Sequence, residues 1–122
     1  MSAPVEKPID QYLPLTEATY CIMLPLTEPL HGYGIMQYVE NISGGRVRLG
    51  PGTLYGALAK LEKDALIIMT LAADRKKCYQ LTPLGCRVLR QEITRLKELV
   101  KYGDSRLSTL NHLLTEQSNE KI

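Results

Sequence analysis

The feature that most constrains the fold of this chain is one long amphipathic segment in its second half. Thr82 and Pro83 are typical of a helix N-cap and of the first helical position, and apolar residues then recur at helical spacing. The recurring residues are Leu84, Val88, Leu89, Ile93, Leu96, Leu99 and Val100. A solitary helix cannot shield an apolar stripe of about five turns from water. The segment must therefore pack against the rest of the chain, against a second copy of itself, or against both.

We predict that this helix covers residues 83–103 and joins two copies of the chain into a homodimer. Gly103 suits the position just past a helix C-terminus, and Asp104 and Ser105 can cap a further short helix within residues 104–122. The residues predicted for the dimer contact, or for a pocket that holds a small-molecule effector, are Leu89, Ile93, Leu96, Leu99 and Val100. The sequence leaves both uses open, because an apolar seam looks the same whether it packs against itself or against a ligand.

The chain before this helix predicts one domain that ends in a β-hairpin. Residues 1–14 hold three prolines and little periodicity, which indicates an N-terminal arm, and the domain is expected over residues 15–82. A helix that begins after Thr16 should end near Pro25. Further helices are predicted over residues 32–42 and 51–64, and strands over residues 67–71 and 77–81. The predicted fold class is mainly α with a small β-hairpin, a winged helix-turn-helix followed by the long C-terminal dimerisation helix.

Charge is distributed unevenly along the chain. Residues 1–45 hold five acidic residues and one basic residue, a net charge of −4. Residues 46–90 hold nine basic residues and three acidic ones, a net charge of +6. A basic patch on a nearly neutral domain is typical of a polyanion site, because each Lys or Arg that neutralises a phosphate releases condensed counterions. On charge alone, an ordinary solvated face is the alternative.

The order of elements and the charges together predict contacts with double-stranded DNA. In a winged helix-turn-helix the third helix enters the major groove, and the hairpin, called the wing, contacts the flanking backbone or the minor groove. Gly52, Thr53 and Gly56 are small where the start of that helix approaches base edges. The side chains predicted to lie at phosphates are Lys60, Arg75, Lys76 and Lys77.

Three stretches of the sequence resemble the PadR family of bacterial transcriptional regulators. They are His31-Gly32-Tyr33-Gly34-Ile35, then residues 44–58 with Gly50-Pro51-Gly52-Thr53-Leu54-Tyr55 at a helix start, and residues 76–85. The resemblance covers residues 16–103 and implies a sequence-specific DNA-binding regulator, expected to be a ligand-responsive repressor that acts as a homodimer. In the short class of that family the single C-terminal helix exchanges between protomers, which implies this role for residues 83–103. The resemblance gives Tyr55 either a DNA contact or a packing role.

Two departures from the family pattern limit what the resemblance implies. Ala65 stands where members usually have Gly in the turn after the recognition helix, so a left-handed cap there costs about 1 kcal/mol. Members that sense flat aromatic drugs use a Trp on the dimerisation helix, and Leu96 occupies the matching position in a chain without Trp. Stacking of such drugs is therefore not implied.

Other classes of function fit the sequence poorly. No nucleophile with a base, no paired carboxylates, no phosphate loop and no dinucleotide fingerprint is present, so we expect no enzyme. Two His and three Cys without close pairing predict no metal site, and no cofactor is expected. The three cysteines are expected to be small buried hydrophobic residues, which fits a reduced compartment. The sequence predicts no signal peptide and no membrane span, so we expect the protein in the cytoplasm. Tyr33 and Tyr79 are expected in the core.

A winged helix that binds a protein partner and not DNA is the alternative function. Such domains present the same hairpin to their partners. The run Arg75-Lys76-Lys77 argues against this function, because a partner-binding hairpin does not need three consecutive cations. The two functions differ in their response to salt, since DNA binding weakens steeply as salt rises.

Overall fold

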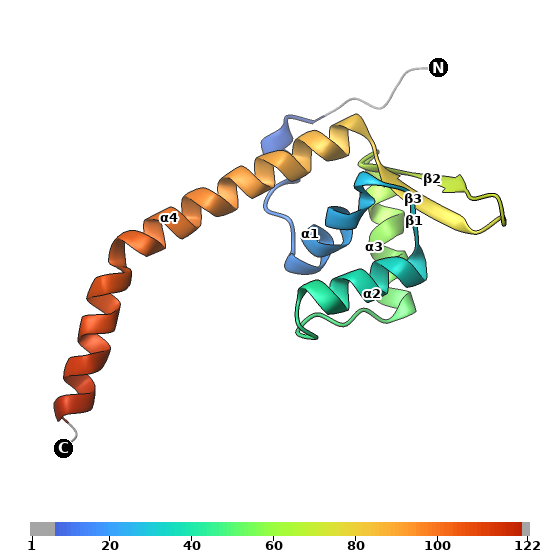
Figure 1. The fold of residues 1–122 in the computed structure, drawn as a ribbon. Coiled ribbons are helices and arrows are strands. Elements are labelled where there is room, and N and C mark those ends of the chain that lie inside the picture. The colour runs from blue at the N-terminus through green and yellow to red at the C-terminus, as the bar shows by residue number, and fades with distance from the viewer. Residues whose placement is uncertain (1–6, 121–122) are drawn as a thin grey trace. The chain divides into compact units, whose positions relative to one another are not determined.

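The computed structural model describes residues 7–120 and divides the chain into two compact units. The first unit extends to Glu92 and the second begins at Ile93. Helices dominate both units, and a small antiparallel sheet lies in the first one (Figure 1). The predicted fold class, mainly α with a small sheet and a long C-terminal helix, is confirmed.

Helix α1 (Glu17–Met23) begins and ends where the sequence predicts. The Thr16 hydroxyl caps the helix by accepting the N–H of Thr19 at 3.1 Å. The chain then tightens into the 3-10 helix Leu24–Thr27, which contains Pro25. The missing N–H of Pro25 therefore ends the α-helix, as expected.

The segment before α1 is more ordered than the predicted arm. Residues 1–6 of that arm lie outside the described residues, but Ile9–Tyr12 form a 3-10 helix. The backbone N–H of Leu15 donates to Oε2 of Glu92 at 2.7 Å, and Glu92 is only 1% exposed. Regular structure is therefore present within residues 1–14, where the sequence predicts an arm. A buried carboxylate far along the chain supplies a tertiary hydrogen bond that the local sequence does not reveal.

Helices α2 (Gly32–Ile42) and α3 (Pro51–Lys63) match the predicted ranges to within a residue. The residue after each helix cap adopts a left-handed backbone, namely Gly44 with φ 62° and Ala65 with φ 59°. After α3, the N–H of Leu66 donates to the carbonyl of Leu61 at 2.9 Å, which closes a Schellman motif. The left-handed conformation expected at Ala65 is thus present.

The predicted hairpin is confirmed, and it gains a third strand. Strand β2 (Ile67–Leu71) pairs antiparallel with β3 (Lys77–Leu81). Strand β1 (Leu30–His31) pairs with the other edge of β3, so the strand order is β1-β3-β2. The sequence did not predict β1, because two residues are too few to show alternation. Through β1, the start of α2 is held beside the wing.

The core of the first unit forms where one face of each helix meets the sheet. Its fully buried apolar side chains are Ile22, Met23, Leu26, Ile35, Val39, Leu54, Leu58, Leu66, Ile67 and Val88. Tyr79 is 5% exposed and belongs to this core, as predicted. Tyr33 is 62% exposed, so its predicted place in the core is wrong. Helix α2 buries Ile35 and Val39 instead, and Tyr33 falls on the opposite face.

Thr82 and Pro83 open helix α4 (Pro83–Glu120), as predicted. The Thr82 hydroxyl accepts the N–H of Gly85 at 3.0 Å and donates to the carbonyl of Ala65 at 2.6 Å. Gly85 permits this approach, because a Cβ there would lie 2.0 Å from the carbonyl oxygen of Leu66. The first turn of α4 is therefore fixed against the turn that follows α3.

Helix α4 continues through Gly103, so the predicted helix end there, with a separate short helix after it, is wrong. A Gly in a helix interior costs about 1 kcal/mol, a local cost that does not end α4 at Gly103. Ser105 does not cap a new helix, since its hydroxyl donates to the carbonyl of Tyr102 at 2.6 Å within the same helix. Among the described residues, no helix combines the length and apolarity needed to cross a membrane.

Two of the three cysteines are placed as predicted. Cys21 and Cys78 are buried, and burial, with nearby Glu17, raises the pKa of the Cys21 thiol. Cys86 is exposed, so its predicted burial is wrong. The first turns of α4 bury Leu84 and Val88 instead, which leaves Cys86 on the solvent side of the helix.

Candidate nucleic-acid interface

Helix α3 has one buried face and one exposed face. Leu54, Leu58 and Leu61 lie in the core. The residues predicted to meet DNA from this helix are all exposed, namely Gly52, Thr53, Tyr55, Gly56 and Lys60. A Cβ at Gly52 or Gly56 would meet no atom within 4 Å, so the space in front of both glycines is open. The first two turns of α3 therefore offer a surface on which a DNA groove can come close to the backbone of the helix.

The wing carries exposed cations at its tip. Arg75, Lys76 and Lys77 are all exposed, and Arg75 has a left-handed backbone with φ 63° that turns the chain. The carboxylate of Asp74 accepts the N–H of Lys76 at 3.2 Å and lies 3.9 Å from Lys76 Nζ. Among the side chains that the structure describes, Arg75 and Lys77 have no acidic partner. These two side chains are available to an external anion.

An open hollow of about 450 Å³ lies where α2, α3 and the wing meet. It is lined by His31, Gly32, Tyr33, Tyr55, Lys76 and Lys77. No side chain caps the start of α2, so its first N–H groups are left to solvent or a ligand. The hollow thus combines cationic side chains with the positive end of a helix.

The structure adds two residues to the predicted interface. Tyr33, expected in the core, lines the hollow, and its hydroxyl accepts a hydrogen bond from the Gln37 amide at 3.2 Å. Gly32 lies beneath the Tyr55 hydroxyl in the same hollow. Both residues belong to the stretch His31-Gly32-Tyr33-Gly34-Ile35, which resembles the PadR family, and this resemblance could have indicated their place at the interface. Periodicity placed Tyr33 on the core side, because its neighbours Ile35 and Met36 are apolar.

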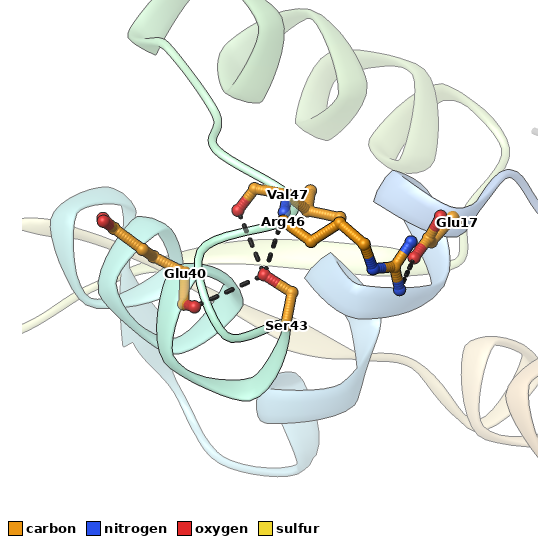
Figure 2. A network of polar contacts seen from close by, with 5 residues as sticks. All are labelled: Glu17, Glu40, Ser43, Arg46 and Val47. Atoms are coloured by element: carbon orange, nitrogen blue, oxygen red, sulfur yellow. Dashed lines mark hydrogen bonds and ion pairs between the residues drawn. The ribbon is translucent and has the colours of Figure 1, made fainter.

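The turn between α2 and α3 holds two arginines that the charge count assigned to the basic surface. Figure 2 shows the Arg46 guanidinium paired with the carboxylate of Glu17, in the first turn of α1. The hydrogen bond to Glu17 raises the pKa of Arg46. Arg48 Nε lies 3.7 Å from Glu40 Oε1. The positive surface around α3 is therefore smaller than the count of basic residues suggests.

The residues predicted for the dimer contact follow α4 across both units and differ in exposure. In the first unit, Leu89 is 6% exposed. In the second unit, Ile93 and Leu96 are half-buried, while Leu99 and Val100 are 47% and 61% exposed. Further apolar side chains of α4 that follow Val100 are exposed, namely Tyr102, Leu107, Leu110, Leu113 and Leu114. The second unit thus keeps an uncovered apolar stripe.

Three short helices, a wing and an exposed recognition face define a winged helix of the class that serves in DNA-binding regulators. The chain belongs to the PadR-like family of transcriptional regulators, whose sequence profile matches residues 22–91. Members of this family are transcriptional regulators and not enzymes. Among the side chains that the structure describes, no group of His, Cys, Asp or Glu could hold a metal ion.

Relatives with known sequences or structures support this assignment. The chain is 47% identical over 64 residues to an uncharacterized protein of transposon TN4556 from Streptomyces fradiae, a match covering 52% of this chain and 18% of that protein. It is 30% identical over 74 residues to the transcriptional regulator YqjI of Escherichia coli, covering 58% of this chain and 36% of YqjI. The chain therefore spans well under half the length of either relative. The X-ray structure of a PadR-like transcription factor from Bacteroides fragilis is similar with a TM-score of 0.58 and 30% identity, covering 71% and 86% of the two chains.

Proposed function

We propose that the protein binds operator DNA sequence-specifically, with helix α3 in the major groove. The observation that carries this proposal is the exposed start of α3, where Gly52, Thr53 and Gly56 leave the backbone open to base edges. Because bacterial DNA lies in the cytoplasm, we also propose a cytoplasmic location for the protein.

Contacts with the DNA backbone are proposed for the cations that surround α3. Lys60 extends from the exposed side of α3, and Arg75, Lys76 and Lys77 extend from the wing. A phosphate group fits the hollow beside Tyr55, because uncapped N–H groups of α2 and two lysines converge there. Such contacts hold the protein in register on the duplex and leave the reading of sequence to α3.

A homodimer formed through α4 is part of the proposal. Residues of α4 in the second unit follow alternating steps of three and four, namely Ile93, Leu96, Val100, Gly103, Leu107, Leu110 and Leu114. Leu89 precedes this seam in the same spacing, and Leu99 borders it. This is the heptad spacing with which two helices interlock their side chains. A second copy supplies a stripe of the same period, which makes it the fitting partner for the exposed seam.

Repression that responds to a small-molecule effector is proposed on the same geometry. In a dimer bound to DNA, the separation of the two α3 helices must match half-sites about one helical turn apart. A ligand between two α4 helices, at the half-buried Ile93 and Leu96, alters that separation and hence the fit to DNA.

A protein-binding winged helix is the second candidate function, because Ile68 and Leu71 on strand β2 are 49% and 62% exposed. Selection of duplexes from a randomised pool, followed by fluorescence anisotropy across a salt series, decides between the two. DNA binding predicts an enriched sequence whose log K falls linearly with log salt. Failure to enrich any duplex contradicts the proposal and favours the protein partner.

A further inference from the structure

The turn that joins α2 to α3 is organised around one hydroxyl group. Ser43 Oγ accepts the N–H of Val47 at 3.0 Å (Figure 2). Its own proton is shared between the carbonyls of Glu40 and Val47, both 3.3 Å away. Gly44, with φ 62°, lets the chain reverse between these groups. Ser43 therefore joins the last turn of α2 to the chain that leads into α3.

The same turn is fastened to α1 by Arg46. The Arg46 backbone N–H donates to the carbonyl of Ser43 at 3.2 Å, and its guanidinium pairs with Glu17. Glu17 is the first residue of α1, which the Thr16 side chain caps. The turn is thus held at two points, to α2 through Ser43 and to α1 through the Arg46–Glu17 pair.

These contacts act on α3 because the connection to it is short. Only Arg48 and Leu49 separate Val47 from Gly50, the residue that precedes the first turn of α3. Val47 and Gly50 are three residues apart and can be separated by at most about 11 Å, and Pro51 fixes one backbone angle at the helix start. A displacement of Val47 is therefore passed on to the start of α3, where Gly52 and Thr53 are proposed to meet base edges.

Direct contact between Arg46 and a DNA phosphate is the competing role for this side chain, which is exposed and basic. The structure favours the positioning role, because the guanidinium is already paired with Glu17 and Arg48 faces Glu40. The two roles predict opposite effects of removing the Glu17 charge. Release of a phosphate-binding Arg46 strengthens DNA binding, whereas loss of a positioning contact weakens the preference for the operator.

We propose that Ser43 and the Arg46–Glu17 pair are positioning residues that set the sequence discrimination of α3 without touching DNA. This inference rests on the proposed DNA-binding function. Sequence discrimination is measured as the ratio of two affinities, one for a duplex selected by the wild-type protein and one for a scrambled duplex of equal composition. Loss of a positioning residue is expected to lower this ratio, because base contacts need an accurately placed helix while phosphate contacts tolerate small shifts.

The decisive experiment measures that ratio and the salt slope for Glu17→Gln, Arg46→Gln and the exchanged pair Glu17→Arg with Arg46→Glu. Each single variant is expected to lower the ratio about three-fold with an unchanged salt slope, and the exchanged pair to recover most of the loss. Glu28→Gln, which removes one exposed acidic charge elsewhere in the first unit, is the matched control and should keep the ratio. Tighter binding by Glu17→Gln, or a slope reduced by about 0.9 in Arg46→Gln, overturns the proposal in favour of a phosphate contact.

Ser43→Ala tests the second point of attachment, with Ser108→Ala as the control. Loss of the hydroxyl leaves the Val47 N–H without its acceptor, and we expect the ratio to fall about five-fold. Circular dichroism checks that Ser43→Ala folds. If Ser43→Ala does not fold, the Glu17 and Arg46 variants alone test the positioning role. A wild-type protein that selects no duplex refutes the proposed function itself. A wild-type protein that selects DNA, with unaltered ratios in every variant, refutes only the positioning role.

Discussion

The hydroxyl group of Tyr55 lies over the backbone of Gly32, where a Cβ would be only 2.4 Å from the Tyr55 oxygen. Gly32 is the buried first residue of α2, whereas Tyr55 is an exposed residue of α3. The two helices of the helix-turn-helix therefore make a close contact at a glycine. This contact keeps the Tyr55 hydroxyl at the hollow in which we propose that a phosphate binds.

Gly32→Ala is expected to lower DNA affinity about five-fold, because the added methyl displaces the Tyr55 hydroxyl from the hollow. The half-exposed ring can rotate into solvent, so the thermal midpoint should change little. In a Tyr55→Phe background the same Gly32→Ala change should cost less affinity, since the clashing oxygen is gone. Anisotropy titrations of the four proteins give this coupling, and equal losses in both backgrounds contradict it.

Ala65→Gly is expected to raise the free energy of unfolding by about 0.5 to 1 kcal/mol. Ala65 has φ 59°, a conformation that costs a residue with a Cβ more than it costs glycine. Ala59→Gly, in the exposed interior of α3, is the control and should lower stability by about 1 kcal/mol. Urea unfolding at one fixed protein concentration measures both changes. A destabilised Ala65→Gly protein contradicts the strain at this turn.

Local rules predicted the elements of the fold closely. Thr16 and Thr82 are helix caps, Pro25 ends α1, and the run of apolar residues after Pro51 gives the buried face of α3. Each of these features depends on neighbours within about one helical turn, which a sequence shows directly. The exposed side of α3 followed from the same periodicity.

The remaining features depend on partners far away in the sequence. The hydrogen bond from Leu15 to the buried Glu92 orders the N-terminal segment, and strand β1 exists because β3 offers an edge. The pairing of Arg46 with Glu17 removes a cation from the basic surface that the charge count predicted. At Gly103 a local preference is overruled, since glycine is suited to end a helix but lies inside α4. Local preference of about 1 kcal/mol is outweighed there by the surrounding helix.

Replacement of Arg75, Lys76 and Lys77 together by Ala is expected to weaken binding to selected and scrambled duplexes alike. The wing offers cations for phosphates but few groups that can read bases. Loss of two to three phosphate contacts should reduce the salt slope by about 2 to 3. Ala at Lys97, Lys101 and Arg106, three exposed cations of α4, removes the same charge and is the control. An unchanged slope in the wing variant shows that the wing does not contact DNA.

Val100→Asp with Leu107→Asp is expected to convert the proposed dimer into a monomer. The two side chains are 61% and 50% exposed, so their replacement removes little packing within one protomer. Two carboxylates in an apolar seam between copies would instead be buried without partners. Ser105→Asp with His112→Asp adds the same groups at exposed positions outside the three-four spacing and should leave the dimer intact. Sedimentation equilibrium at micromolar concentration decides, and a wild-type monomer refutes the dimer outright.

Gly56→Glu is expected to abolish operator binding while the fold survives. A Cβ at Gly56 meets no atom within 4 Å, so the new side chain disturbs no packing in the protomer. Replacement of a helical Gly should even favour α3 by about 0.5 to 1 kcal/mol. In the major groove, however, the carboxylate would face base edges and phosphates at close range, where a negative charge is repelled. Circular dichroism and urea unfolding should therefore show a protein at least as stable as the wild type, whereas anisotropy shows no binding to the selected duplex. Ser108→Glu, with the same added charge in the second unit, should bind normally. Wild-type affinity in Gly56→Glu means that a surface other than the start of α3 reads the DNA.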